Sequence, residues 1–315
     1  MKYGFGVDLG GTTVKLAYFD EAGTLLDKWE IPTVTENNGA QILPDIAKAI
    51  DTYLQNNRIQ KSHILGIGIG VPGPVDRKGT VNRCVNLGWG VFNVEQALEA
   101  LTDLPVKAGN DANMAALGEC WKGSGQGYQD MVMVTLGTGV GGGIIIGGNI
   151  VCGAGGSAGE IGNMIICREE TEIHTSGNRG CVEQYCSATG VVRLANRYLS
   201  AMDTPSVLRQ REQLTCKDVF DIAAAGDLAA IAILEQFYAL LGEFLANICT
   251  ALDPEAVIIG GGVSKAGDVI LRGIRPHFLK HVFHASQNAE FKLASLGNDA
   301  GAYGAFRLVL QSLEK

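Results

Sequence analysis

The sequence lacks an excess of positive charge. It has 25 Lys and Arg residues against 33 Asp and Glu residues, which gives a formal net charge of -8. A chain this acidic has no electrostatic footprint for nucleic acid or for an anionic membrane surface. We therefore expect neither partner, and a bound polyanion must be held by local groups such as clusters of backbone N–H.

An apolar leader segment is also missing, because the N-terminal MKYGFGVDLGG goes directly into an alternating strand pattern. We therefore expect a cytoplasmic protein whose eight Cys residues stay reduced. The most apolar stretch, residues 229–252, contains Glu235, Gln236 and Glu243. These polar residues predict a buried helix rather than a membrane span.

Charge and proline are sparse, whereas glycine is abundant. Charged residues make up 18% and hydrophobic residues 46% of the 315 positions, which allows a large core and argues against disorder. The 43 glycines gather at Gly10–Gly11, Gly137–Gly148, Gly153–Gly162 and Gly260–Gly262. Such clusters indicate tight turns or a close approach of the backbone to a ligand.

The order of the elements predicts an α/β protein with mixed sheets. Residues 4–32 have the pattern of three strands joined by short turns, which predicts an antiparallel meander at a sheet edge. Apolar strands are also expected within residues 63–73, where the strand ends in a loop, and at residues 256–260, and a short one before Asn110. Helices are expected over about residues 40–55, 94–101, 229–252 and 300–312.

A weak internal duplication predicts two related domains. The form V-x-L-G occurs at residues 7–10 and again at residues 134–137, and both copies lead into a second apolar strand. We expect a smaller domain of residues 1–118 plus the C-terminal helix in 301–315, and a larger domain of residues 119–300. The C-terminal helix should pack back on the first domain.

No Walker motif is present, so phosphate binding must come from other loops. Residues 137–142 match G-x-G-x-x-G, but a strand follows them where a dinucleotide fold requires a helix. Asp8 at a strand end, followed by Gly10, Gly11 and Thr12, suits phosphate and a water-coordinated Mg²⁺. The alternative is a tight hairpin turn with an incidental aspartate.

Three further features suggest ligand-binding groups. Gly260–Gly262 follow an apolar strand and leave room for a flat group such as adenine, although a simple left-handed cap would use the same residues. Asp111, beside Asn110, is placed to accept a proton from a hydroxyl group, the alternative being a helix cap. Glu160 and Glu183 bracket a stretch with two Cys and one His, and they could bind sugar hydroxyls.

Seven motifs together resemble the ROK family of sugar kinases, within the actin/hexokinase-like superfamily. They are VDLGGTTVK, GVPGPVD, GNDAN, VTLGTGVGGG, GEIG, GNRGCVEQY and IIGGGVSKAG. The resemblance spans essentially the whole chain, from Gly6 to about Gly304. Within that family the chain is most similar to the ATP-dependent glucokinases of bacteria. The resemblance implies a duplicated, ribonuclease H-like fold with two domains around a cleft, and a homodimer. It also implies that ATP and Mg²⁺ are used to phosphorylate glucose at the 6-hydroxyl, at the entry to glycolysis.

The resemblance assigns a role to each matching residue. Asp111 would be the general base on the sugar 6-hydroxyl. One loop would hold the phosphates and Mg²⁺, and it consists of Asp8, Gly10, Gly11 and Thr12. A second loop would also hold phosphates, and it consists of Gly137, Thr138 and Gly139. Adenosine would lie against Gly261, Gly262 and Val263. The other sugar hydroxyls would be bound by Asn86, Asn110, Glu160, Asn163 and Glu183.

The chain departs from the family where zinc is usually bound. Family members commonly carry E-x-G-H and then C-x-C-G-x-x-G-C, whose His and three Cys are the ligands. Here Asn163, His174 and Ser176 occupy three of those positions, and Cys181 is unchanged. His174 and Cys181 are thus the remaining candidate ligands. Because a structural zinc site needs four good ligands, we expect the zinc to be lost. Asn163 should alter sugar affinity.

Other functions stay open at this point. Another ROK kinase could act on fructose, mannose, allose or an N-acetylhexosamine. A sugar-sensing repressor would need an N-terminal helix-turn-helix of about sixty residues, whereas Asp8 is close to the start of this sequence. A non-catalytic sugar-binding regulator is disfavoured because Asp8, Asp111 and all three glycine loops are present.

Overall fold

The computed structural model describes residues 1–314, which form two compact units. The first unit contains residues 1–129, residues 143–159 and the C-terminal segment from Ser295. The second contains residues 130–142 and 160–294. The domain limits at residues 118 and 300 stay a prediction. Residues 143–159, which we assigned to the larger domain, cluster with the first unit.

The first unit is built on a five-stranded mixed sheet with the strand order β3-β2-β1-β4-β7. β1 pairs antiparallel with β2, and β2 with β3, so the predicted meander at one sheet edge is confirmed. β4 and β7 continue the sheet in parallel pairings. The strands are β1 (Tyr3–Leu9), β2 (Thr13–Asp20), β3 (Leu25–Pro32), β4 (Ile64–Val71) and β7 (Val106–Asn110).

Helices cover this sheet, and a small hairpin lies beside it. The apolar face of α2 (Ile42–Asn56) joins the core residues of β1 and β4 in one buried cluster. The other helices are α1 (Glu36–Gly39), α3 (Val94–Thr102), α4 (Asp111–Lys122) and α10 (Ala300–Leu313). The hairpin consists of β5 (Thr80–Cys84) and β6 (Trp89–Asn93).

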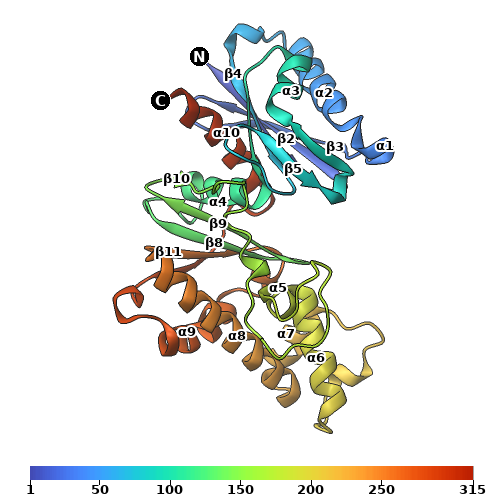
Figure 1. Ribbon diagram of the computed structural model, residues 1–315, viewed down its shortest axis with the longest axis vertical. Helices are drawn as coiled ribbons and strands as arrows, with labels where there is room; N and C mark the ends of the chain where they lie inside the picture. The colour runs from blue at the N-terminus through green and yellow to red at the C-terminus, as the bar shows by residue number, and fades with distance from the viewer. Residues whose placement is uncertain (315) are drawn as a thin grey trace. The chain divides into compact units, whose positions relative to one another are not determined.

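The C-terminal helix α10 packs on the first sheet, as expected from the sequence (Figure 1). Glycines in the strands allow the close contact. A Cβ on Gly68 would lie 1.8 Å from the carbonyl oxygen of Ala305, and one on Gly6 would lie 2.0 Å from that of Ala302. A larger residue at either position would therefore push the helix off the sheet.

A second five-stranded sheet has the order β10-β9-β8-β11-β12. β11 pairs in parallel with both β8 and β12. The strand, glycine turn and strand predicted from Met131 onward are β8 and β9. The strands are β8 (Met131–Leu136), β9 (Val140–Ile146), β10 (Asn149–Ile150), β11 (Ala256–Gly260) and β12 (Glu290–Leu293).

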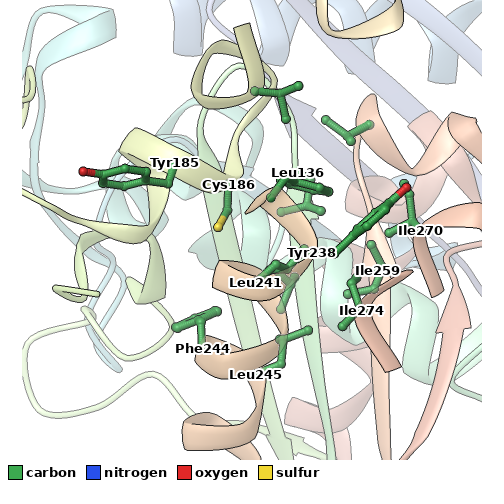
Figure 2. Packing of buried hydrophobic residues seen from close by; sticks show 14 of the residues in the cluster. Leu136, Tyr185, Cys186, Tyr238, Leu241, Phe244, Leu245, Ile259, Ile270 and Ile274 are labelled. Carbon is green, nitrogen blue, oxygen red and sulfur yellow. The ribbon is translucent and has the colours of Figure 1, made fainter. Parts of the chain in front are cut away.

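The helices of the second unit surround one long apolar helix, α8 (Leu228–Leu252). By length and composition α8 is the one helix in residues 1–314 that could cross a membrane, but 56% of its apolar window is buried inside the fold. Figure 2 shows Leu241 and Leu245 packed among core residues such as Ile259 and Ile274. The prediction of a buried helix is confirmed. The other helices are α5 (Val182–Cys186), α6 (Ala188–Ala201), α7 (Cys216–Ala224) and α9 (Asp268–His281).

Candidate active site

The turn between β1 and β2 is the first predicted phosphate loop. The N–H of Gly10 closes this turn by donating to the carbonyl of Thr13 at 3.0 Å. No heavy atom lies within 4 Å of the position that a Cβ on Gly11 would take. The N–H groups of Gly11 and Thr12 are exposed, and no residue in 1–314 accepts a hydrogen bond from them. Two successive amides of this kind can bind an anion.

Asp8 lies just before that turn, with its carboxylate against the start of α10. A Cβ on Gly301 would lie only 2.8 Å from Cγ of Asp8. Lys15 is the cross-strand partner of Asp8, and its Nζ lies 3.5 Å from Oδ2. Burial raises the pKa of Asp8, and the nearby Lys15 ammonium opposes that shift. No role was predicted for Lys15, although the register of a hairpin could have paired it with Asp8.

Asn110 and Asp111 occupy the junction of β7 and α4. Asn110 caps the helix, since its Oδ1 accepts the N–H of Asn113 at 3.1 Å and its Nδ2 donates to the carbonyl of Gly73 at 3.1 Å. Asp111 is the first helical residue, and its Oδ1 accepts the N–H of Ala112 at 2.8 Å. A helix N-terminus favours a negative charge there. The cap is therefore Asn110, and Asp111 follows it.

Asn86 lies on the surface, two residues after Cys84. The loop that contains Gly73 lies between Cys84 and the junction of β7 and α4. A Cβ on Gly73 would lie 3.7 Å from Cβ of Cys84, while the Gly73 carbonyl accepts the hydrogen bond from Asn110. Burial raises the pKa of the Cys84 thiol, the N–H of Asn86 opposes the shift, and the charge of Asp111 adds to it. The structure thus places Cys84, two residues before Asn86, beside the loop that Asn110 binds.

The turn between β8 and β9 is the second predicted phosphate loop, and it repeats the plan of the first. The N–H of Gly137 closes the turn on the carbonyl of Gly139 at 2.9 Å. The carbonyl of Gly137 accepts the N–H of Ala188 at 2.8 Å, and that of Thr138 accepts the hydroxyl of Thr189 at 2.9 Å. The first turn of α6 therefore fixes this loop from outside.

Glu183 in α5 also supports the second loop. Its Oε2 accepts the N–H of Val140 at 2.7 Å, and a Cβ on Gly139 would lie 2.3 Å from the same oxygen, so a larger residue there would displace the carboxylate. Its Oε1 lies 3.3 Å from Nε2 of His174. Because a carboxylate has about four acceptor positions, each oxygen keeps capacity for a further hydroxyl group.

Glu160 and Asn163 lie close to Glu183 in the second unit. Nδ2 of Asn163 is 3.4 Å from Oε2 of Glu160, and both residues are exposed. Partial desolvation raises the pKa of Glu160, and the negative charge of Glu183 raises it further. Three of the predicted sugar-binding side chains are therefore grouped in this unit. Asn163 binds a glutamate here at the position where the family has a histidine.

The two candidate zinc ligands do not fit a zinc site. His174 uses both ring nitrogens, since Nδ1 lies 3.0 Å from Oγ of Ser176 and Nε2 faces Glu183. Cys181 is completely buried. Within residues 1–314 no group of three His, Cys, Asp or Glu residues is placed to hold a metal ion. A structural zinc ion needs four such ligands.

A cavity of about 720 Å³ lies beside the loop that follows β11. Gly261 enters this loop with a φ of +83°, and a Cβ there would lie 2.5 Å from the backbone of Leu136, so glycine is required. Gly262 and Val263 line the cavity. Its other walls include apolar side chains, three cations and two carboxylates, namely Phe220, Leu234, Tyr238, Lys217, Lys265, Arg272, Asp221 and Glu235. Lys217 forms an ion pair with Asp221. Such a lining suits a flat base that carries anionic phosphates.

The cavity and the second phosphate loop share a residue. Ala188 lines the cavity and also donates its N–H to Gly137. Two of the predicted nucleotide-binding segments are therefore adjacent within the second unit. The cavity residues of α7, α8 and α9 were not foreseen, because nothing in an amphipathic helix distinguishes a cavity wall from ordinary core.

The chain is similar to known proteins over almost its whole length. A family model described as the ROK family matches residues 4–312. The chain belongs to the ROK family. It is 44% identical to a glucokinase from Halalkalibacterium halodurans, over 98% of this chain and 96% of that relative. It is 32% identical to the N-acetylgalactosamine kinase AgaK of a Shewanella species, over 96% of this chain and 94% of the relative.

A solved ROK structure has the same fold. The ROK glucokinase of Streptomyces griseus, in complex with glucose and AMPPNP, has a TM-score of 0.77 and 33% identity, covering 98% of this chain and 99% of its own. The predicted fold class and the family resemblance are confirmed. The ROK motifs of the sequence lie at the turns and junctions described above.

Proposed function

We propose that this protein is a glucokinase, which transfers the γ-phosphoryl group of ATP to the 6-hydroxyl of glucose. The observation that carries the proposal is 44% identity over nearly the full chain to a glucokinase. The S. griseus relative, bound to glucose and AMPPNP, supports the choice of both substrates. The cavity beside Gly262 has the size and lining for the nucleotide.

In the proposed reaction Asp111 accepts the proton of the 6-hydroxyl. The 6-oxygen forms a bond to the γ-phosphorus, the bond from that phosphorus to the β,γ-bridging oxygen breaks, and ADP leaves with the electron pair. The amides of Gly11, Thr12, Thr138 and Gly139 donate to phosphate oxygens. The first glycine of each loop, whose N–H closes the turn, keeps the loop in shape.

Other side chains orient the sugar. Asn110 and Asn86 of the first unit, and Glu160, Asn163 and Glu183 of the second, bind its remaining hydroxyl groups. Carboxylate and amide groups suit this task because each can accept more than one hydrogen bond. Both oxygens of Glu183 already have protein partners, so its orientation is set before glucose binds.

Mg²⁺ is part of the proposal, with Asp8 as the residue that would hold it through water. A single carboxylate fits this ion, because Mg²⁺ keeps several waters and takes other ligands from substrate phosphates. When bound, the ion neutralises the charge that develops on the transferred phosphoryl group. Lys15 next to Asp8 adds a second positive charge at this end of β1.

The alternative is that the protein phosphorylates a sugar other than glucose, and the 32% identity to an N-acetylgalactosamine kinase supports this alternative. A coupled assay with ATP, Mg²⁺ and a panel of glucose, fructose, mannose, allose, N-acetylglucosamine and N-acetylgalactosamine tests the choice. We expect the highest kcat/KM for glucose. A higher value for an N-acetylhexosamine would overturn the substrate and keep the reaction class.

Three further properties belong to the same proposal. We infer that the protein is a cytoplasmic enzyme that acts at the entry to glycolysis, and that two copies form a homodimer. We infer also that it folds as two domains close to the limits expected from the sequence. Light scattering of the purified protein measures the mass of the assembly against 33.2 kDa for one chain.

A further inference from the structure

A buried glutamate lies in the middle of the loop that connects Glu160 to Glu183. The side chain of Glu170 is 1% exposed, and its backbone belongs to an irregular segment between two short elements. An isolated buried carboxylate is strongly unfavourable, so its partners must compensate for the lost water. The family places its zinc in this same loop, where the residues of this chain do not fit the metal.

Glu170 is fully surrounded by donors. Arg197 binds it with two parallel bonds of 2.9 Å, one to each carboxylate oxygen. Arg193 and the hydroxyl of Tyr185 donate to Oε2. The N–H groups of Thr171 and Glu172 donate to Oε1, each at 2.9 Å. Arg197 and the other donors hold the pKa of Glu170 far below its ordinary value.

These donors come from three different segments. Tyr185 is in α5, and Arg193 and Arg197 are one turn apart in α6. The guanidinium of Arg193 also lies over the Tyr185 ring, with Cζ 5.1 Å from its centroid, and binds the exposed Glu172. We name Glu170, Tyr185, Arg193 and Arg197 the Glu170 cluster. It joins the loop to α5 and α6, as a metal ion joins ligands from separate segments.

The cluster is linked to Glu183 through one short helix. Glu183 and Tyr185 both lie in α5, which has only five residues. Between them, Gln184 accepts the N–H of Gly180 at 2.8 Å and donates to the carbonyl of Glu172 at 3.0 Å. Any rotation of α5 that frees Tyr185 would therefore also move the carboxylate of Glu183 away from the N–H of Val140.

We propose that the Glu170 cluster holds the loop of residues 160–183 in place without a metal ion and thereby positions Glu183 for glucose. We call this arrangement the metal-free clamp. Its members are positioning residues, since none of them has been placed against substrate. This inference rests on the proposed function. It assigns the fixing of this loop to four side chains of this chain.

The test compares Glu170→Gln with wild-type enzyme. The substitution keeps the shape and removes the charge. We expect KM for glucose to rise at least tenfold. KM for ATP should rise by a smaller factor, because Glu183 also holds the second phosphate loop through Val140, whereas the nucleotide cavity is lined by other residues. Tyr185→Phe removes one donor and keeps the ring, so its glucose KM should rise about threefold. Hydrogen exchange of residues 160–183 should speed up in both variants.

Glu290→Gln is the matched control, because it removes a carboxylate from an exposed ion pair with Lys292 in the same unit. It should leave both KM values unchanged. If Glu170→Gln does not fold, the glucose KM values of Tyr185→Phe and Arg197→Lys provide the test instead. Normal glucose KM in all folded cluster variants would overturn the clamp.

Two further outcomes separate this inference from others. One zinc per chain in protein purified without chelator, or loss of activity on chelation that Mg²⁺ does not restore, would overturn the metal-free clamp. A wild-type protein that phosphorylates no glucose would refute the proposed function instead. In that case the hydrogen-exchange comparison of residues 160–183 still tests the clamp.

Discussion

The two groups of proposed catalytic and sugar-binding residues are held in place by different forces. Asn110 and Asp111 lie where β7, an edge strand of the first sheet, ends and a helix begins, so backbone hydrogen bonds of regular elements fix them. Glu160 and Glu183 belong to a region with little regular structure, which is held by the side chains of the Glu170 cluster. The first group depends on local geometry and the second on long-range ionic contacts.

The difference teaches where each site is vulnerable. A residue at a strand-to-helix junction keeps its place when one neighbour changes, because many backbone bonds share the task. A loop that depends on one buried carboxylate loses several contacts at once when that carboxylate is changed. The following experiments test this contrast, beginning with the largest expected effect.

Asp111→Asn should slow the phosphoryl-transfer step and change little else. The amide keeps an oxygen that can accept the N–H of Ala112 but cannot take the substrate proton. We expect kcat to fall by about 10²- to 10⁴-fold, with glucose KM and stability nearly unchanged. Steady-state kinetics and urea unfolding measure these quantities. An unchanged kcat would refute the assigned base.

Glu170→Gln should lower stability more than any single change at the junction. Arg193 already has one buried nitrogen without a partner among residues 1–314, and loss of the Glu170 charge leaves it with Glu172 alone as a counterion. Breaking a buried ion pair of this kind costs about 3 kcal/mol. Urea unfolding of both proteins at pH 7 gives the value. A loss of unfolding free energy below about 1 kcal/mol would mean that the Glu170 cluster and the strand-to-helix junction do not differ in this way.

Acid should remove the stabilisation that the charge of Glu170 contributes to the folded protein. Because the folded-state pKa of Glu170 is lowered, chiefly by Arg197, the cluster stabilises the protein fully above the ordinary glutamate value of 4.5. The contribution is lost progressively as the pH falls below that value. The free-energy difference between wild type and Glu170→Gln should therefore shrink between about pH 5 and pH 3. A constant difference over this range would contradict the charge-based explanation.

Asn110→Ala should cost about 1 kcal/mol, the usual value of a helix cap. Asn93 gives a matched control, because it caps α3 by accepting the N–H of Gln96 at 2.8 Å and has no proposed contact with sugar. We expect similar losses of unfolding free energy in Asn110→Ala and Asn93→Ala. Glucose KM should rise only in Asn110→Ala. An equal rise in both would mean that Asn110 acts through the fold alone.

Asn163→His should have the smallest effect. It exchanges one weak hydrogen bond to Glu160, 3.4 Å long, for an imidazole that can titrate. Exchange of a single hydrogen bond corresponds to about 1 kcal/mol, so glucose KM should change about three- to tenfold while kcat changes less. An unchanged KM would show that residue 163 does not contact the sugar.

Much of the fold and part of the site could be predicted from the sequence. The meander, the long buried helix and the return of α10 followed from local patterns of apolar and turn residues. The position of Asp111 followed from a short strand that ends in polar residues. The exact cap did not, because Asn110 and Asp111 are both good cap residues and only the start of the helix decides between them.

The loop between Glu160 and Glu183 was the least predictable region. The sequence indicates that three of the four family zinc positions are changed, so that only His174 and Cys181 remain as candidate ligands, but it does not indicate what holds the loop instead. Glu170 is followed by Glu172 in a polar run that resembles an exposed loop, and Arg193 and Arg197 have the spacing of ordinary surface residues on a helix. Nothing local connects these residues, which are separated by more than twenty positions in the chain.

The sequence by itself determined the family, the order of strands and helices, and the glycine turns, because each depends on residues close together in the chain. Only the tertiary structure decided the packing of Asp8 against α10, the walls of the nucleotide cavity and the burial of Glu170. Those features depend on which distant side chains share a region of low water content. A glutamate and two arginines become a clamp only when folding removes the water around them.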